Sequence, residues 1–500
     1  MPKIYLSPST QDWNPYVTGS GSEEYHMNRI ADALVPYLMS NGIQFSRNRP
    51  EMTAASSIRE ANAGEYDLYL ALHSNASPES RAGQERGIIV FYYPGSAEGQ
   101  RAAELIAEEL KQIYPLPDKV TTRTTTALGE VRQPRFPAVL AEIGYHDNYE
   151  DALWIEGHTD AIAQQLARAL TAYFGLPFTP DEARLVLISA PWDVTVSYGT
   201  GTSEAPDAII EASMQLDLYD ALSPGAWRRG IATADIDYSL LETSQRLRSD
   251  AERVIRHLEE GGSVADDAVC RKIRRVNEGC VQMNENIRAQ ARAWLAQGKL
   301  VGLVGGDHST PYGLVQALGE RGEGFGILHI DAHCDLRRAY EGFEYSHASI
   351  MYNVLRDVPQ AERIVEVGVR DYCDAEAELA RSSERIRMFD DTQLSAAAFE
   401  GETWGATCRR IVAELPERVY VSFDIDGLSV EYCPHTGTPV AGGLTFNQAV
   451  YLLHETVRSG RRIIGFDVVE VVPRPGSSID ASTGARILYK LCGLTLKSEL

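Results

Sequence analysis

The sequence predicts an α/β protein of two domains, and three observations lead to that prediction. The chain has 500 residues, more than one hydrophobic core usually supports, because domains commonly run to about 100–200 residues. Apolar, strand-like runs alternate with amphipathic helical stretches along its whole length. All seven cysteines lie at or after Cys270, so the two parts of the chain differ in composition.

The charge balance excludes several classes of partner. Lys and Arg number 47 against 70 Asp and Glu, for a net charge of −23, whereas nucleic acids and anionic membranes attract basic surfaces. No apolar run approaches the length of a transmembrane helix, and the first residues lack the apolar segment of a signal peptide. We therefore expect a cytoplasmic protein without nucleic-acid or membrane partners. The odd number of cysteines and the absence of a CxxC motif indicate neither a disulfide framework nor a zinc ribbon.

The first predicted domain covers residues 1–178. Strand-like runs lie at 4–7, 67–74, 87–93 and 138–144, with amphipathic helices at 27–38, 100–113 and 161–173. Gly175 and Pro177 then act as helix stop signals, which puts the boundary at about 175–182.

The second predicted domain covers residues 179–500. Its strand-like runs lie at 185–189, 300–306, 326–331, 364–370, 419–426 and 463–470. These runs are rich in β-branched residues and almost continuously apolar, which is typical of strands buried on both faces by crossover helices. The sequence therefore predicts a mainly parallel sheet, and residues 239–297 have a polar, helical pattern.

Acidic and histidine residues follow three of these strands, in GGDHST (305–310), DAHCD (331–335) and SFDID (422–426). The carboxyl ends of parallel strands meet at one edge of a sheet, so six side chains should gather there: His308, Asp331, His333, Asp335, Asp424 and Asp426. Four carboxylates this close together require cations, and two divalent ions would balance them. Oxygen and nitrogen ligands without thiolates favour two Mn²⁺, with Co²⁺, Ni²⁺ or Zn²⁺ as alternatives.

These motifs carry a family resemblance. GGDHS, DAHCD and SFDIDGL, followed by TGTPVAGGL (436–444) and FDVVEVVP (466–473), resemble the ureohydrolases, which include arginase, agmatinase and formiminoglutamase. The resemblance implies a three-layer α/β/α, arginase-like fold and a homo-oligomer. It also implies that Asp331 and Asp424 bridge two ions, that His308 and Asp335 complete one site, and that His333 and Asp426 complete the other. One departure is Gly427-Leu428-Ser429-Val430, where the family usually has GLDP.

The implied reaction is metal-assisted hydrolysis of a small guanidino compound to an amine and urea. By the same resemblance Glu470 holds the guanidinium group, Asp426 accepts a proton from the attacking hydroxide, and His347 passes a proton to the leaving amine. The spacing from DAHCD to Ser346-His347 resembles that of agmatinases, so agmatine or a related compound is the expected substrate. Arg337 leaves an alternative open, because a basic residue there suits the carboxylate of a formiminoglutamase substrate; it fits equally well as a surface residue or as a member of an ion pair between subunits.

The first domain has a resemblance of its own. IYLSPST, GSEEYHMNRIADAL (21–34), LALHSNA (70–76) and LAEIGYHDN (140–148) resemble the zinc-dependent N-acetylmuramoyl-L-alanine amidases. The resemblance implies that Glu24 and His73 bind one Zn²⁺ and that Glu142 is the catalytic glutamate. Peptidoglycan would then be a further partner.

One zinc ligand is missing from this pattern. The amidases carry a histidine in the turn after the first strand, where this chain reads Ser7-Pro8-Ser9-Thr10-Gln11, and a catalytic zinc normally keeps three protein ligands. His146 and His26 are candidate substitutes, although His26 stands two residues from Glu24 and such residues do not share a helix face. The sequence leaves two alternatives: a zinc amidase as the main activity, or a degenerate domain retained for binding or assembly.

Overall fold

The computed structural model describes residues 3–40, 43–170, 178 and 180–500. The chain forms two compact units, Met1–Pro177 and Phe178–Leu500. The end of the predicted helix at 171–173, Gly175 and Pro177 lie outside the described residues. Within the described ranges, no helix combines the length and the apolar character that a membrane crossing needs.

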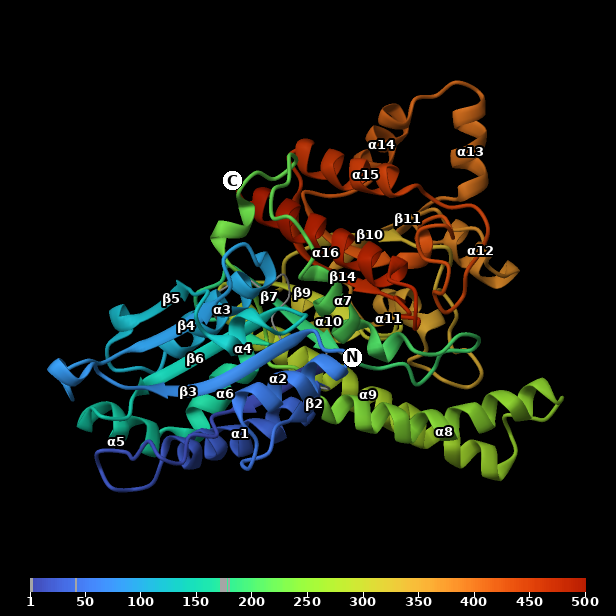
Figure 1. Cartoon of the computed structure of the whole chain (residues 1–500). Coiled ribbons are helices and arrows are strands. Elements are labelled where there is room, and N and C mark those ends of the chain that lie inside the picture. The colour runs from blue at the N-terminus through green and yellow to red at the C-terminus, as the bar shows by residue number, and fades with distance from the viewer. Residues whose placement is uncertain (1–2, 41–42, 171–177, 179) are drawn as a thin grey trace. The chain divides into compact units, whose positions relative to one another are not determined.

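The first unit is built on a six-stranded sheet in the order β2-β1-β3-β6-β4-β5 (Figure 1). Its strands are β1 (Lys3–Pro8), β2 (Gln44–Arg47), β3 (Leu68–Asn75), β4 (Ile88–Tyr92), β5 (Val120–Thr124) and β6 (Ala138–Tyr145). All neighbours are parallel except β4 and β6. The sheet contains the four predicted strands, and the two that the apolar pattern missed are its edges.

The helices of this unit are α1 (Glu23–Ser40), α2 (Ala54–Ala63), α3 (Ala97–Lys111), α4 (Gly129–Arg132), α5 (Tyr149–Gly157) and α6 (Thr159–Ala169). On one face, Tyr5 of β1 stacks on Tyr69 of β3 with 5.3 Å between ring centroids. Ile58 of α2 and Val131 of α4 complete that cluster. The register of β3 and β6 pairs His73 with Glu142, so two of the predicted site residues are neighbours across the sheet.

The second unit is built on an eight-stranded, entirely parallel sheet in the order β12-β11-β10-β13-β14-β9-β7-β8. Its strands are β7 (Leu185–Ala190), β8 (Ile231–Thr233), β9 (Leu300–Gly305), β10 (Phe325–Ile330), β11 (Ala361–Val367), β12 (Ile386–Phe389), β13 (Arg418–Asp424) and β14 (Arg462–Val469). The predicted parallel sheet is confirmed with all six expected strands. The short strands β8 and β12 are again its edges.

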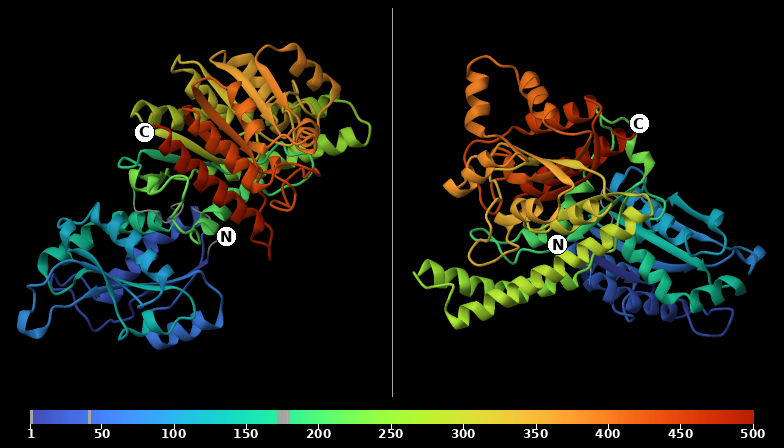
Figure 2. Two further views of the ribbon diagram at one scale, coloured as in Figure 1. Left: turned by 90° about the horizontal axis from the view of Figure 1, so that it is seen from above. Right: turned by 180° about the vertical axis from the view of Figure 1, so that it is seen from behind.

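Helices cover both faces of this sheet and give the α/β/α layering (Figure 1; Figure 2). They are α7 (Ala205–Ser213), α8 (Ser239–Glu259), α9 (Asp267–Ala296), α10 (Tyr312–Gly319), α11 (Ile350–Asp357), α12 (Asp374–Ser382), α13 (Asp391–Phe399), α14 (Trp404–Ala413), α15 (Phe446–Arg458) and α16 (Ile479–Lys497). Helices α8 to α11 share one core with β7, β9 and β10. Helices α8 and α9 form a long hairpin that extends beyond the sheet (Figure 2).

The strand order explains where the site forms. Strands β10, β13, β14 and β9 are consecutive neighbours in the sheet, and each is followed at its carboxyl end by one of the motifs singled out in the sequence. In open parallel sheets, ligands bind outside this edge. The fold thus brings together segments that are up to about 160 residues apart in the chain, as when Glu470 contacts His308.

Candidate functional site

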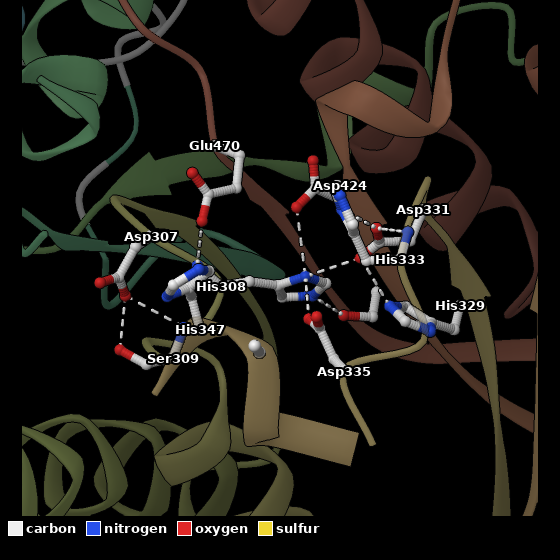
Figure 3. Close-up of polar contacts among 12 residues, drawn as sticks. Asp307, His308, Ser309, His329, Asp331, His333, Asp335, His347, Asp424 and Glu470 are labelled. Atoms are coloured by element: carbon white, nitrogen blue, oxygen red, sulfur yellow. Dashed lines mark hydrogen bonds and ion pairs between the residues drawn. The ribbon is translucent and has the colours of Figure 1, made fainter. Parts of the chain in front are cut away.

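The predicted ligands of the second unit meet in one buried cluster (Figure 3). The Nδ1 atom of His308 lies 2.9 Å from Asp331 Oδ2, 3.0 Å from Asp335 Oδ2 and 3.2 Å from Asp424 Oδ2. A single imidazole nitrogen cannot donate one proton to three carboxylates, and His308 Nδ1 makes no well-formed hydrogen bond. Oxygens that converge on one point around a nitrogen are the arrangement that a cation fits.

Asp331 joins this group to a second one. Its Oδ1 lies 3.4 Å from His333 Nδ1, and the same nitrogen lies 3.2 Å from Asp426 Oδ2. Among the described residues, two groups could therefore hold a metal ion. One consists of His308, His329, Asp331 and Asp335, and the other of Asp331, His333 and Asp426. The donors, imidazole and carboxylate only, suit a hard or borderline divalent cation.

Contacts behind the cluster orient its members. His308 Nε2 lies 2.9 Å from Ser422 Oγ, which donates to Asp467 Oδ2. His329 Nε2 lies 2.9 Å from Asp331 Oδ2. Partners of this kind fix the orientation of metal-binding histidines. The sequence analysis missed His329, although it precedes Asp331 by two residues and strand alternation puts both on one face.

Two of the candidate residues have unusual backbone conformations. Asp335 and Glu470 have φ angles of 52° and 62°, in the left-handed region that few residues other than glycine adopt. Such strain is retained where the surroundings hold it, often at active sites. Glu470 Oε1 accepts a hydrogen bond from the His308 amide at 2.8 Å, and Thr436 Oγ1 donates to the Glu470 carbonyl.

Burial and neighbouring charges shift the pKa values of the residues in this cluster. Burial by itself would lower the pKa of His333. The carboxylates of Asp426 and Asp331 outweigh that effect and raise the pKa to about 12. Burial raises the pKa of Glu470 well above its usual range, and Asp307 adds to that shift. A buried cluster of this kind is costly without compensating positive charge. The residues present therefore fit a divalent metal centre.

A cavity of about 360 Å³ opens beside the cluster. It is lined by Ser197, Tyr198, His333, Asp335, Arg337, Tyr340, His347, Ala348, Asp371, Glu376, Thr438, Pro439 and Val440. His347 Nε2 lies 3.5 Å from Ser197 Oγ, and Thr195 Oγ1 accepts the His347 amide hydrogen. Burial, followed by the charges of His333 and His308, lowers the pKa of His347 to about 3.

Arg337 has its charge balanced within the protein. Its Nε lies 3.5 Å from the buried Glu376 Oε2, and its guanidinium group lies 4.7 Å from the centroid of the Tyr340 ring. The structure thus places Arg337 at the cavity wall in an ion pair within the chain, rather than in the pair between subunits that the sequence left open.

The first unit contains a different cluster, centred on His73. Its Nδ1 lies 2.9 Å from Glu23 Oε1, and its Nε2 lies 2.9 Å from Glu130 Oε2. The sequence analysis selected Glu24, and the structure corrects that choice. Glu23 is 1 % exposed, whereas Glu24 lies alongside Asn28. One residue along a helix turns the side chain by about 100°, and it is Glu23 that contacts His73.

The residues present do not fit a catalytic zinc ion. Each ring nitrogen of His73 lies next to one carboxylate, as expected for two separate hydrogen bonds. At His308, by contrast, three carboxylate oxygens lie close to the same nitrogen. Gln11, near the missing histidine, presents its amide nitrogen 3.4 Å from His73 Nδ1. Asn14 fixes that orientation, since its Nδ2 donates to Glu23 Oε2 and to Gln11 Oε1. An amide NH₂ group is a donor and no metal ligand.

Neither substitute histidine fills the gap. His26 bonds with Ser20 Oγ at 2.9 Å and stacks on Tyr16. His146 Nδ1 lies 3.0 Å from the Ser74 carbonyl oxygen. The predicted zinc site thus lacks its third ligand among the described residues.

The His73 cluster predicts a pH-dependent stability of the first unit. Burial by itself would lower the pKa of His73. The hydrogen bonds to Glu130 and Glu23 outweigh that effect and raise the pKa to about 10. A raised pKa contributes stability that is complete below the unfolded value, about 6.5, and is lost as the pH rises towards 10. Pulse proteolysis read by mass spectrometry, which reports peptides of residues 3–170 separately, should show that loss. The decrease of the unfolding free energy with rising pH should be smaller in His73→Gln. An equal decrease in this variant would show that His73 is not the titrating group.

Comparison with known families identifies the larger unit. The model of the arginase family matches residues 183–493, more than half of the chain. This chain belongs to the arginase family. The N-acetylmuramoyl-L-alanine amidase model matches residues 10–172 of this arginase-family protein, so both resemblances inferred from the motifs are confirmed.

Named relatives of the arginase-family unit are ureohydrolases. The chain is 30% identical over 322 residues to N(1)-aminopropylagmatine ureohydrolase from Thermus thermophilus, covering 64% of this chain and 94% of the relative. It is 32% identical over 193 residues to agmatinase from Cronobacter sakazakii, covering 38% of this chain and 58% of that one. Proclavaminate amidino hydrolase from Streptomyces clavuligerus has the same fold, with a TM-score of 0.50, 22% identity and coverage of 66% and 97%. Together these matches establish an arginase-family hydrolase with agmatinase-like relatives.

Proposed function

We propose that residues 179–500 form a ureohydrolase that uses two Mn²⁺ ions to cleave a linear guanidino amine such as agmatine to an amine and urea. The observation that carries the proposal is the double cluster sharing Asp331, beside a cavity that also contains His347. The names of the relatives support the same substrate class. Residues 1–178 form the accompanying amidase-like domain.

His308, Asp331, Asp335 and Asp424 would hold one ion, and Asp331, Asp424, His333 and Asp426 the other. When bound, such a pair lowers the pKa of water and so supplies a nucleophile at neutral pH. The side chains of the protein then position the substrate and transfer protons. Asp426 Oδ1 accepts the Ala332 amide hydrogen and its Oδ2 accepts from Thr438 Oγ1, which holds this carboxylate ready to accept a proton.

Glu470 supplies the group that binds the guanidinium. A planar guanidinium forms paired, charge-assisted hydrogen bonds with a carboxylate, and it would neutralise a carboxylate that is 4 % exposed. Room for this contact depends on Gly437, because a Cβ atom there would lie 3.2 Å from Glu470 Oε2. His347, which lines the cavity, passes the proton to the departing amine.

The ion pair between Arg337 and Glu376 favours a guanidino amine over a formimino amino acid as the substrate. A substrate carboxylate would need an unpaired cation, and Glu376 already pairs with Arg337. Asp371, a further acid on the cavity wall, suits a substrate whose far end is neutral or positively charged. The pocket chemistry thus supports the agmatine class.

A substrate panel tests the proposal. The full chain loaded with Mn²⁺ should release urea from agmatine, and a chelator should abolish that release. We expect little urea from arginine or 4-guanidinobutyrate and little formamide from formiminoglutamate, because each carries a carboxylate. Urea release that survives metal removal would contradict the metal mechanism. Turnover of the carboxylates in preference to agmatine would contradict the substrate class.

A further inference from the structure

The first unit contains a cavity of about 430 Å³ above the His73 cluster. Its lining combines acidic, neutral polar and apolar groups, among them Gln11, Trp13, His73, Glu130 and Glu142. Trp13 stands at this wall with 68 % of its surface exposed, so its indole ring is available to a ligand. The cavity lies wholly within the unit.

Two of the three carboxylates around His73 have their hydrogen bonds satisfied by the protein. Glu23 accepts from Asn14 Nδ2 at 2.7 Å in addition to its His73 contact. Glu130 Oε1 accepts from the hydroxyl groups of Ser7 and Tyr69, both at 2.7 Å. These bonds hold both carboxylates in their ionised form, with His73 between them.

Glu142 is the exception. Its Oε2 is buried and has no hydrogen-bond partner among the described residues, although the side chain lines the cavity. Strand pairing holds it beside His73. A buried polar atom without a partner is costly, and a ligand in the cavity would remove that cost by donating to Glu142.

The charge of the cavity specifies the ligand. Burial raises the pKa of Glu142 to about 7. The ionised carboxylates of Glu23 and Glu130 already outnumber the one imidazolium group, so the cluster has a net negative charge in either state of Glu142, and this favours a cation. A zinc ion does not fit, because the Gln11 amide and the separate contacts of the two His73 nitrogens with Glu23 and Glu130 leave no converging ligand set. An organic cation suits both the unpartnered carboxylate and the indole face of Trp13, since ammonium and guanidinium groups bind over aromatic rings.

We propose that this cavity is a metal-independent binding site for an organic ammonium or guanidinium group, held between Glu142 and Trp13. A free small amine or guanidine and the free side-chain amine of a cell-wall peptide present the same group. The proposal does not depend on the ureohydrolase activity of residues 179–500, because its evidence lies entirely in residues 3–170.

Calorimetric titration of the chelator-treated full chain tests the site. The probes are 1,4-diaminobutane, butylguanidine, its neutral isostere butylurea, and an alanyl-glutamyl-lysyl-alanine stem peptide with a free or an acetylated lysine amine. Sites elsewhere in the chain contribute equally to every variant of the first unit, so differences between variants report this cavity. The arm that binds more tightly, small cation or free-amine peptide, identifies the source of the group.

Glu142→Gln should weaken cation binding at one site by about 10- to 100-fold, because a charged hydrogen bond is lost. Trp13→Ala should weaken it several-fold, and its exposed side chain makes misfolding an unsuitable explanation. The matched control Glu65→Gln alters an exposed carboxylate of the same unit outside the cavity and should bind as the wild type does. Butylurea and the acetylated peptide should not compete.

Three results would overturn the proposal. Binding that is equal in the wild type, Glu142→Gln and Trp13→Ala would remove the assigned contacts. Binding of butylurea as tight as that of butylguanidine would remove the charge requirement. Zinc that binds the wild type with one ion more per chain than His73→Gln would show that the cavity is a metal site after all.

Discussion

Asp331→Asn is expected to abolish urea release and to lower the metal content of the protein. The two oxygens of Asp331 face different partners, Oδ2 towards His308 and His329 and Oδ1 towards His333. An asparagine keeps the shape but replaces one oxygen by a donor and removes the charge, so both ion positions are weakened together. A loss of about 4 kcal/mol of the stabilisation that metal ions provide corresponds to about 10³-fold in rate.

Metal analysis and steady-state kinetics of the same preparation check this result. The matched control is Asp217→Asn, which changes an exposed aspartate of the same unit outside the cluster and should keep normal metal content and turnover. If Asp331→Asn retained both ions and near-normal turnover, Asp331 would not be the shared ligand. Loss of one ion alone would place Asp331 at a single position.

The central strands of both sheets could be predicted because burial on two faces leaves a strong sequence signal. The mainly apolar run at 419–423 is an example, and it lies in the middle of the larger sheet as part of β13. Edge strands lack that signal. The residues of β5, Val120–Thr124, are mainly polar, because one side of an edge strand meets solvent or loops, and only tertiary pairing reveals them.

The clustering of the candidate metal ligands could be predicted for a related reason. Most of these residues stand directly after apolar strands, so a local pattern and one topological rule together predict where each one lies. His329 was missed because it lies inside the apolar run of β10 and looks like part of the core. The Ser422–Asp467 contact behind His308 joins two strands and has no local signature.

The first unit shows where motif matching fails. Glu23 and Glu24 are adjacent and chemically identical, and only the rotation of α1 relative to the sheet decides which one faces His73. Glu130 lies 57 residues from His73 in the chain, within a short polar helix that nothing in the sequence marks as functional. Its contact with His73 Nε2 changes the interpretation of the whole site from zinc ligation to a histidine hydrogen-bonded between two carboxylates.

His347→Ala is expected to slow turnover by about 10²- to 10⁴-fold with the metal content unchanged, as for the loss of a positioned general acid. His347 lines the cavity with His333 and Asp335, yet its own partners are hydroxyl groups. Its Nε2 lies 3.5 Å from Ser197 Oγ and its Nδ1 lies 3.2 Å from Ser346 Oγ. It is absent from both groups that can hold a metal ion.

The combination of kinetics and metal analysis separates proton transfer from ligation. Burial and the nearby His333 and His308 hold the pKa of His347 low, so the ring is neutral until a proton reaches it during the reaction. The same pKa leaves a lone pair that a cation could use, which is why the metal content of the variant decides the role. His257→Ala, on the α8–α9 hairpin, is the matched control and should leave both quantities unchanged. Metal loss in His347→Ala would make His347 a ligand, and unchanged turnover would assign the proton to another donor.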